Sequence, residues 1–312
     1  MLNTPVLFLI FNRPDTTQQV FDEIRKAQPA QLFVAADGPR KDRPEDQELC
    51  KKTRNIIREV DWECRVFTRF HEENLGCKIA VSSAIDWFFS NVDEGIILED
   101  DCVPDPSFFP FCEKMLEHFR YDTRVMMVAG TNNLFNRIEI PETYYFSRYY
   151  SIWGWATWRR AWKFYDIRMR KWPHVRESGD LSLYYPDRSV QNYLKFEFDL
   201  VAMDYHQTWD FQWFFSCIMQ HGLAVVPKYN LIANIGIQGI HTAKSSKLNK
   251  MPLKSIDFHN IIHPEYVFPN SVLDRITFES VIDKSLRKKI SILMMKFGAT
   301  DIGKAFRKTI RK

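Results

Sequence analysis

The chain contains no apolar run approaching the roughly 20 residues that a transmembrane helix needs. The apolar run at residues 5–11 has no basic region before it and no small-residue cleavage site after it, so it predicts a first strand and not a signal peptide. The six cysteines are scattered, with no Cys-x-x-Cys pair and no repeated spacing. Without a secretory signal, this pattern predicts reduced thiols in a cytoplasmic protein.

Glycine-rich phosphate-binding motifs are also missing. Neither a Gly-x-Gly-x-x-Gly fingerprint nor a Walker A sequence occurs in the 312 residues, which disfavours a dinucleotide-binding or P-loop enzyme. The charge distribution disfavours a nucleic-acid binder. From residue 283 onward ten Lys and Arg face two Asp, a net charge of +8, and since the whole chain is +4 the remainder is −4. With 45% hydrophobic and 15% aromatic residues, the chain can bury a full core and is not expected to be disordered.

The most informative feature that is present is an apolar run followed by three carboxylates. Residues 96–98 are too short a run for a helix and predict a buried strand, which ends at Glu99-Asp100-Asp101. Three neighbouring negative charges repel one another, and a divalent cation would offset this cost. Carboxylate oxygens suit Mg²⁺ or Mn²⁺, which also bind substrate phosphates. The triplet therefore points to an enzyme acting on a phosphate-bearing substrate; the alternative is a solvated acidic turn.

The first third of the chain alternates strand-like and helix-like segments. The pattern predicts strands at 5–11, 31–36, 63–67 and 95–98 and helices at 16–27, 46–60 and 79–90. This alternation predicts parallel βαβ units, that is, an α/β fold whose sheet has helices on both faces. Ligands bind beyond the carboxyl ends of such strands, so Asn12-Arg13, Asp37 and the acidic triplet are expected at one edge of the sheet.

Four segments in a fixed order, each beside a predicted strand end, carry a family resemblance: Phe11-Asn12-Arg13-Pro14, Ala36-Asp37-Gly38-Pro39-Arg40, Asn74-Leu75-Gly76-Cys77-Lys78 and Ile97-Leu98-Glu99-Asp100-Asp101-Cys102. Together they resemble nucleotide-sugar-dependent glycosyltransferases of the GT-A fold. The resemblance is greatest to bacterial surface-polysaccharide transferases, which are similar to N-acetylglucosaminyltransferase I and its Glu-Asp-Asp motif. It spans about residues 5–242.

This resemblance implies a domain plan and a fold. A GT-A (Rossmann-like), mixed and mainly parallel sheet flanked by helices would occupy residues 1–245. Its nucleotide-binding half would span about 1–105 and its acceptor-binding half about 106–245. Residues 246–312 would form a C-terminal loop and a basic amphipathic helical extension.

The resemblance also implies roles for the residues at the sheet edge. The nucleotide-sugar would be held by Arg13, Asp37, Lys78, Glu99 and Asp100, and the metal by Asp101. Arg13 and Asp37 would contact the base and ribose, while Lys78 would approach the diphosphate as a point charge. Two alternatives stay open: Asp37 only builds its turn, and Lys78 is a solvated surface lysine.

Seven of the nine tryptophans lie between residues 153 and 213. Aromatic faces with polar edges suit sugars and can floor a substrate cleft. Trp153 and Trp155, on either side of Gly154, are therefore predicted to wall the donor-sugar or acceptor site, together with Trp209. This assignment also fits the resembling family. Trp158 and Trp162 are four residues apart, and the prediction for them is the core-facing stripe of one helix.

Asp210 lies among aromatic residues in segment 207–213. Such surroundings raise the pKa of a carboxylate and improve it as a base near neutral pH. By position and context, Asp210 resembles the carboxylate that deprotonates the acceptor hydroxyl in inverting GT-A enzymes. The alternative, which is compatible with catalysis, is that Asp210 caps a helix at 211–221. Asp204 is the second candidate for this base.

Residues 224–236 predict a strand pair, or one strand and a turn, leading to a histidine in a glycine-rich segment. The resemblance implies that this residue, His241, completes the metal or diphosphate site; a purely structural histidine is the alternative. Residues 243–254 are rich in Lys and Ser and predict a mobile loop, which could cover the donor as a lid.

The C-terminal tail has an amphipathic pattern. One helical face carries Leu286, Ile290, Leu293, Met294 and Phe297, and most basic residues lie off it. Such a helix predicts peripheral contact with an anionic inner membrane, where each near-surface basic residue contributes about 1 kcal/mol. The alternative is a helix docked on the catalytic domain. The expected location is the cytoplasm, peripheral on the cytoplasmic face of the inner membrane.

Taken together, these features predict a metal-dependent, inverting glycosyltransferase using Mn²⁺ or Mg²⁺. It would move a hexosyl or N-acetylhexosaminyl group from a UDP-linked donor to a hydroxyl of a surface-polysaccharide, lipopolysaccharide or lipid-linked acceptor. One alternative is a sugar-nucleotide nucleotidyltransferase, but those enzymes generally have a Gly-rich loop after the first strand and the segment at 11–14 has no glycine. The other alternative is a non-catalytic, membrane-associated scaffold with a GT-A fold.

Overall fold

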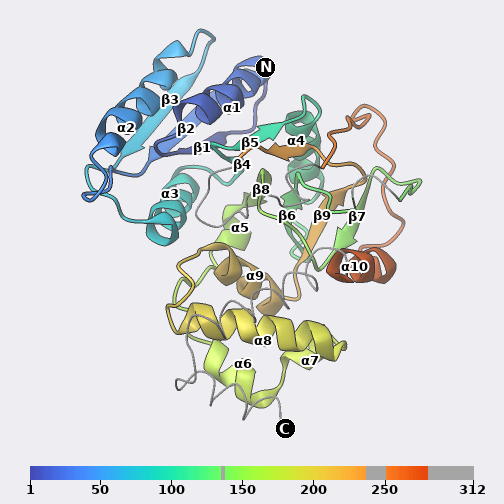
Figure 1. Cartoon of the computed structure of the whole chain (residues 1–312). Coiled ribbons are helices and arrows are strands. Elements are labelled where there is room, and N and C mark those ends of the chain that lie inside the picture. Colours follow the sequence, from blue (N-terminus) through green and yellow to red (C-terminus); the bar gives the residue numbers. More distant parts are fainter. Residues whose placement is uncertain (135–137, 237–250, 280–312) are drawn as a thin grey trace.

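The computed structural model describes residues 1–134, 138–236 and 251–279 (Figure 1). Its strands are β1 Val6–Ile10, β2 Gln31–Ala36, β3 Arg65–Phe70, β4 Glu94–Glu99, β5 Cys102–Pro104, β6 Val125–Ala129, β7 Tyr144–Ser147, β8 Trp155–Trp158, β9 Leu223–Pro227 and β10 Ile232–Asn234. Its helices are α1 Pro14–Ala27, α2 Glu45–Asn55, the 3₁₀ turn η1 Ile56–Glu59, α3 Cys77–Asn91, α4 Phe108–His118, α5 Arg159–Trp162, α6 Trp172–Ser178, α7 Leu181–Tyr184, α8 Arg188–Ala202, α9 Asp210–Met219 and α10 Ser271–Thr277.

An 8-stranded sheet of order β3-β2-β1-β4-β8-β6-β9-β7 forms the centre of the molecule, and β10 pairs separately with β5. Strand β1 pairs in parallel with β2 and β4, and β3 is parallel to β2. The carboxyl ends of these four strands therefore lie at one edge. Strand β8 is antiparallel to both its neighbours, β9 is parallel to β6, and β7 is antiparallel to β9. The predicted fold class is confirmed: an α/β fold with a mixed, mainly parallel sheet flanked by helices.

Alternation along β1 divides the core into two layers. Val6, Phe8 and Ile10 face the layer that contains α1 and α4, whereas Leu7 and Leu9 face the layer that contains α3. Successive side chains of a strand point to opposite faces, so a strand whose residues are all apolar must be covered on both sides. A third apolar cluster joins α6, α7, α8 and α9, which Figure 1 shows gathered away from α1 and α2.

Most predicted elements of the first third are present with small shifts at their ends. Strand β2 has the predicted bounds, and the helix expected at 46–60 is divided into α2 and η1. Residues 224–236 form two strands, as one prediction held, but β9 belongs to the large sheet and β10 pairs with β5.

The predicted helical stripe of Trp158 and Trp162 is wrong in its secondary structure. Trp158 ends strand β8 and Trp162 ends helix α5, because the chain leaves the sheet at Arg159, whose backbone N–H donates to the carbonyl of Asp93 at 2.7 Å. Both tryptophans are nonetheless buried in the core, as expected.

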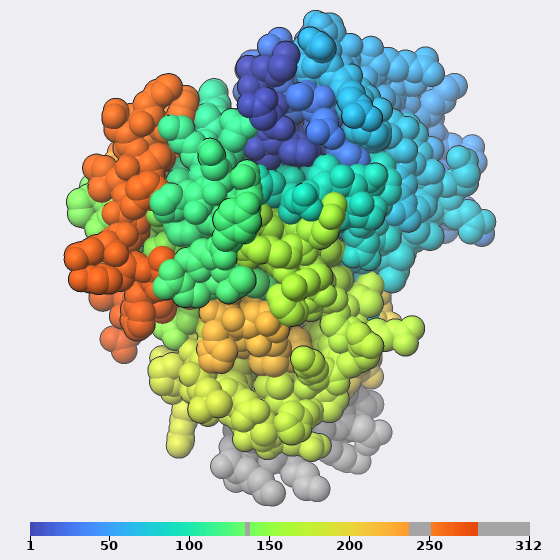
Figure 2. All heavy atoms as spheres, turned by 180° about the vertical axis from the view of Figure 1, so that it is seen from behind, coloured from blue at the N-terminus to red at the C-terminus, as the bar shows by residue number. Residues whose placement is uncertain are grey.

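The segment 251–279 packs against the part of the chain that follows β4. In Figure 2 this orange segment lies along one side, against the green part of the chain and away from the blue N-terminal part. Hydrogen bonds join Thr143 to Ile262 and Ser255 to Asp105. No helix in the described ranges is both long and apolar enough to cross a bilayer. The predicted tail helix, and the domain limit at 245, lie outside the described residues.

Candidate active site at the carboxyl edge of the sheet

The acidic triplet is bound by an arginine from the neighbouring strand. Glu99 ends β4, and the next two residues lead into β5. Arg13, which follows β1, donates from Nη1 to Oδ2 of Asp101 at 2.9 Å and from Nη2 to Oδ1 of Asp100. The backbone N–H of Phe11 donates to the other oxygen of Asp100 at 3.3 Å. The parallel pairing of β1 with β4 thus brings together groups 87 and 88 residues apart.

This contact changes how the charge of the triplet is balanced. The prediction from the sequence gave that task to a divalent cation, whereas here a guanidinium lies between two of the carboxylates. Burial lowers the pKa of Arg13, but the charges of Asp100 and Asp101 outweigh it and leave that pKa above its ordinary value. Arg13 is therefore a fixed positive charge, and with all three carboxylates ionised the group still carries a net charge of −2.

Burial and the remaining negative charge raise the pKa values of two of the three carboxyl groups, Glu99 and Asp100. Burial, then the charges of Asp101 and Asp100, raise the pKa of Glu99 to about 8. Burial also raises the pKa of Asp100 to about 6, although Arg13 opposes that shift. The edge therefore favours a proton or another cation near neutral pH.

Glu99→Gln is expected to stabilise the metal-free protein more at pH 8 than at pH 6. The pKa of Glu99 is raised from 4.5 to about 8, so within this window the folded protein holds a proton that the unfolded chain has released. The stability contributed by this group therefore falls as the pH rises. Glutamine does not ionise, and we expect the variant to gain on the order of 1–2 kcal/mol over the wild type between these pH values.

Urea unfolding in EDTA at the two pH values measures this difference. Glu94→Gln, at the opposite end of the same strand, is the control and should follow the wild-type pH dependence. If wild type and Glu99→Gln lose the same stability between pH 6 and pH 8, the carboxyl group of Glu99 is not the source of the effect.

Asp37 follows β2, and both of its carboxylate oxygens accept hydrogen bonds from nearby groups of the chain. Oδ1 accepts the backbone N–H groups of Gly38 at 2.9 Å and Leu75 at 2.8 Å. Oδ2 accepts the side-chain amide of Asn74 at 2.9 Å and the N–H of Gly76 at 3.1 Å. These are the turn-building contacts of the alternative interpretation, and they fix the loop that leads into α3. A contact of Asp37 with a base or ribose stays a prediction.

Asp46 is a buried carboxylate beside Asn12. The sequence predicts only that Asp46 starts a helix, and does not indicate that it is buried or paired. Its side chain is fully buried. It accepts from the amide of Asn12 at 2.7 Å and from Nε of Arg40 at 2.6 Å. Arg40 also lies over the ring of Phe11, 5.5 Å from its centroid. The Asp-Gly-Pro-Arg turn was visible in the sequence, but nothing in the spacing indicated which acid would receive its arginine.

Lys78 joins the first turn of α3 to the turn that follows α8. Its Nζ lies 2.7 Å from Oδ1 of Asp204 in that turn, where Asp204 has a left-handed backbone with φ of 63°. The side chain of Lys78 is 16% exposed, so the solvated alternative is wrong. Asp204, the second candidate for the base, is therefore engaged in an ion pair. Contact of Lys78 with a diphosphate stays a prediction.

Asp210 lies in the first turn of α9 and within electrostatic reach of the triplet. The helix runs from Asp210 to Met219 with Trp209 at its N-cap, so the alternative in which Asp210 caps a helix at 211–221 is wrong. Oδ1 of Asp210 accepts from the hydroxyl of Thr208 and from the N–H of Phe211, at 2.9 Å for the latter. Burial is the main cause of the raised pKa of Glu99, and the charge of Asp210 adds to it.

The thiol of Cys77, at the start of α3, reports the same convergence. Cys77 as a residue is exposed, but the pKa of its thiol is raised, first by partial desolvation and then by the charges of Glu99, Asp210 and Asp37, while Arg13 opposes the shift. Charges from the ends of β1, β2 and β4 and from the start of α9 therefore act on one point. The structure brings together residues whose roles were predicted from separate segments of the sequence.

Two of the tryptophans predicted to wall the substrate are in the core. Trp155 and Trp209 are 1% and 2% exposed, and their rings stack at 5.9 Å. Trp162 and Trp213 complete the cluster, with Trp213 5.7 Å from Trp155. The hydroxyl of Tyr165 donates to the carbonyl of Trp209 at 3.1 Å. This cluster holds the start of α9, and hence Asp210, against strand β8 instead of presenting rings to a ligand.

Trp153 is the predicted wall residue that is not fully buried. Its carbonyl accepts from the hydroxyl of Thr131 at 2.9 Å. Gly154 follows with φ of 56°, and a Cβ there would collide with the side chain of Ile232 and lie 3.2 Å from that of Leu98. The absence of a side chain at Gly154 thus lets the backbone lie close to Leu98, near the carboxyl end of β4.

The chain after β10 closes one side of Asp101. The N–H of Ile235 donates to the backbone carbonyl of Asp101 at 2.8 Å, and a Cβ on Gly236 would collide with the Asp101 carboxylate. His241, the predicted second metal ligand, is five residues further on and lies outside the described residues.

The side chains at this edge can ligate a hard cation such as Mg²⁺ or Mn²⁺ only when further ligands complete its coordination. Asp101 is 13% exposed; Arg13 binds its Oδ2, and the thiol of Cys102 donates to its Oδ1 at 3.4 Å. Within the described parts of the chain, no three His, Cys, Asp or Glu side chains are grouped to hold a metal. Mg²⁺ is commonly held by one or two carboxylates together with substrate phosphates and water. One carboxylate here fits a cation that arrives with a diphosphate.

No protein-family model and no curated protein matches this chain. Among solved structures, apo UDP-glucose pyrophosphorylase is similar over 75% of this chain and 94% of its own, with 9% identity and a TM-score of 0.38. Mouse xyloside xylosyltransferase 1 in its apo form is similar over 70% and 83%, with 13% identity and a TM-score of 0.35. HddC from Yersinia pseudotuberculosis is similar over 50% and 77%, with 9% identity and a TM-score of 0.32. Likenesses this distant do not choose between a pyrophosphorylase and a glycosyltransferase reaction.

Proposed function

We propose that this chain is an inverting glycosyltransferase that uses a nucleoside-diphosphate sugar, UDP-linked, and a hydroxyl of a bacterial surface glycan or lipid-linked glycan as acceptor. The observation that supports it best is the pairing of Arg13 with the acidic triplet at the carboxyl edge of a mainly parallel sheet, with Asp210 near enough for its charge to act on Glu99. In open α/β sheets, ligands bind beyond this edge. Sugar transfer from a nucleoside-diphosphate donor needs charged groups that hold the diphosphate and a base that deprotonates the acceptor. Arg13 and the triplet suit the first task, and Asp210, on a separate helix, suits the second.

In this proposal, the triplet and Arg13 hold the donor. The carboxylate of Asp100 accepts hydrogen bonds from Arg13 and from the backbone N–H of Phe11. It is therefore held in one orientation where the nucleotide-sugar would bind. Asp101 would hold Mn²⁺ or Mg²⁺ together with the diphosphate, and His241 would join it. When bound, such a cation offsets the charge that builds on the departing diphosphate. Lys78, at the start of α3, would contribute a second positive charge toward the diphosphate, although it is paired with Asp204 in this structure.

Asp210 acts as the base. It takes the proton of the acceptor hydroxyl as the hydroxyl oxygen forms a bond to the anomeric carbon. The bond from that carbon to the diphosphate oxygen breaks on the opposite face, and the diphosphate leaves with the bonding electrons. The sugar passes through an oxocarbenium-like state, and the anomeric configuration inverts. Thr208 and the first turn of α9 hold the Asp210 carboxylate in place for this step.

The proposal predicts release of UDP from a UDP-sugar by the purified chain, and loss of that release in Asp101→Ala. A thermal-shift screen of nucleotide sugars with and without Mn²⁺ first identifies the donor, because a ligand that binds only the folded state raises the Tm. Coupled assays then measure UDP released from the UDP-sugar and, in a parallel sample given UTP and the matching sugar 1-phosphate, pyrophosphate released as the UDP-sugar forms. Pyrophosphate formation without UDP would instead favour a nucleotidyltransferase, and no turnover despite a bound donor would favour a non-catalytic scaffold.

A further inference from the structure

Asn234, the last residue of β10, is a buried polar side chain beside the end of the acidic triplet. It is 7% exposed, and in the antiparallel pair of β10 with β5 it lies directly opposite Cys102. The next residue, Ile235, donates its N–H to the backbone carbonyl of Asp101 at 2.8 Å. The pairing of β10 with β5 therefore brings the side-chain amide of Asn234 next to Asp101, although the two residues are far apart in the sequence.

Both ends of the Asn234 amide make hydrogen bonds. Oδ1 accepts the N–H of Gly236 at 3.0 Å, the contact by which an asparagine side chain closes a turn with the backbone two residues further on. Nδ2 donates to Sγ of Cys102 at 4.0 Å, and this thiol donates in turn to Oδ1 of Asp101 at 3.4 Å. A thiol can both accept and donate, so one buried sulfur atom links Asn234 to the Asp101 carboxylate.

The turn that Asn234 closes lies against the same carboxylate. A Cβ on Gly236 would collide with Oδ2 of Asp101 and would lie 3.2 Å from Nη1 of Arg13. Arg13 donates to this Oδ2 at 2.9 Å, while Cys102 donates to the other oxygen. Arg13, Cys102 and the backbone of Gly236 thus enclose the Asp101 carboxylate on three sides, and two of these three contacts depend on Asn234.

We propose that Asn234 is a positioning residue, which fixes the orientation of the Asp101 carboxylate through Cys102 and through the turn at 234–236. The inference rests on the proposed function, in which this carboxylate receives a cation together with the donor diphosphate. Groups that orient a metal ligand without touching the metal typically contribute a factor of about 10–100 to metal affinity. Few protein groups are proposed as ligands here, so the affinity depends strongly on how Asp101 is oriented.

The first test titrates the full chain with Mn²⁺ in the presence of UDP and measures the Mn²⁺ concentration that gives half of the rise in Tm. Asn234→Ala should raise this concentration about 10- to 100-fold. Cys102→Ala should raise it as well, because the Asp101 carboxylate then loses the thiol contact. Cys102→Ser keeps a hydrogen-bond donor at this position and should restore the wild-type concentration.

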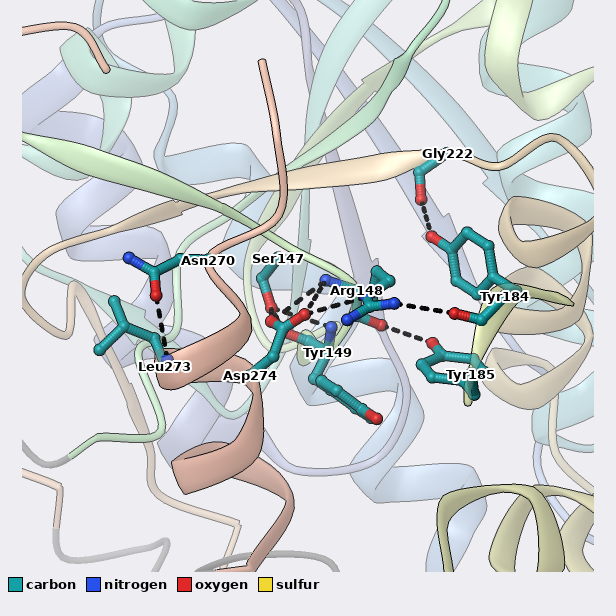
Figure 3. A network of polar contacts seen from close by, with 9 residues as sticks. All are labelled: Ser147, Arg148, Tyr149, Tyr184, Tyr185, Gly222, Asn270, Leu273 and Asp274. Carbon is teal, nitrogen blue, oxygen red and sulfur yellow. Dashed lines mark hydrogen bonds and ion pairs between the residues drawn. The ribbon is translucent and has the colours of Figure 1, made fainter. Parts of the chain in front are cut away.

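The control is Asn270→Ala, at an asparagine that makes the same kind of contact elsewhere. Oδ1 of Asn270 accepts the N–H of Leu273 at 3.1 Å and so caps α10, as Figure 3 shows. The backbone N–H of Asn270 donates to the carbonyl of Phe146 in β7 at 2.8 Å. The variant loses a contact between an asparagine and the backbone, as Asn234→Ala does. It should lower the Tm without changing the Mn²⁺ concentration.

A second test needs neither metal nor donor. In EDTA, Asn234→Ala should lower the Tm less in an Asp101→Ala background than in the wild type, because part of what it disrupts is then already absent. Asn270→Ala should lower the Tm equally in both backgrounds. This comparison separates a side chain that acts on the Asp101 carboxylate from one that only stabilises its own turn.

Equal Tm losses of Asn234→Ala in the two backgrounds would overturn the inference, whether or not the chain transfers sugar. An unchanged Mn²⁺ concentration in Asn234→Ala, beside a wild type that responds to Mn²⁺ and UDP, would overturn it too. A Cys102→Ser variant that behaves like Cys102→Ala would overturn the link through the sulfur atom. A wild type without any response to Mn²⁺ and UDP would count against the proposed function, and the Tm losses in EDTA would still decide whether Asn234 positions the carboxylate.

Discussion

Asp210→Asn is expected to lower the rate of sugar transfer by about 10²- to 10⁴-fold, the usual contribution of a positioned general base. Donor binding should change little, because Asp210 lies on α9 and the proposed donor contacts come from the ends of β1 and β4. Asparagine keeps the size and the acceptor oxygen that Thr208 and the N–H of Phe211 contact, so the helix start is preserved. Only the capacity to take a proton is lost, and the effect should fall on kcat.

The chain offers a matched control in Asp204, an acid in the turn just before α9. Asp204→Asn breaks the ion pair with Lys78 but leaves the Asp210 carboxylate unchanged. We expect at most a small loss in kcat and a change in the affinity for the donor if Lys78 approaches the diphosphate. Steady-state rates of UDP release with a saturating acceptor measure both variants. A large loss in Asp204→Asn beside a normal rate in Asp210→Asn would transfer the role of base to Asp204.

The strands could be predicted because each is specified by residues that are neighbours in the sequence. Strand β2 is an apolar run ended by Asp37-Gly38, so both its existence and its bounds follow from neighbouring residues. The existence of β1 and β4 follows in the same way, because their all-apolar interiors indicate burial on both faces, although each predicted bound is one residue off. Since parallel strands end at one edge, the order of the strands and their polar ends was enough to assign these residues to a common site.

The partners of those polar residues could not be predicted in the same way. Whether Trp155 lines a site or is buried depends on β8 inserting between β4 and β6, which is a pairing between distant segments. Hydrophobic pattern cannot distinguish an aromatic residue that binds sugar from one that fills a core. Similarly, the sequence identified the repulsion within the triplet but not that Arg13, 88 residues away, would partly neutralise it.

Arg13→Gln is expected to destabilise the metal-free protein by about 3 kcal/mol, the lower end for breaking a buried ion pair, because Arg13 itself is one-third exposed. The loss arises from Asp100 and Asp101, which are 4% and 13% exposed and would lose the guanidinium that offsets their charges. Mn²⁺ can replace the missing positive charge, so it should raise the Tm of this variant more than that of the wild type. Melting curves in EDTA and in Mn²⁺ measure both effects.

Arg40→Gln separates this effect from a general weakening of the edge. Arg40 is 32% exposed, almost as much as Arg13, and its partner Asp46 is fully buried, so this variant also breaks a buried pair. It leaves the triplet intact, and therefore Mn²⁺ should not restore its Tm. An equal response to Mn²⁺ in wild type, Arg13→Gln and Arg40→Gln would mean that no cation competes with Arg13 for the triplet. In that event the guanidinium, and not a metal, would be the positive charge that the donor diphosphate meets at this edge.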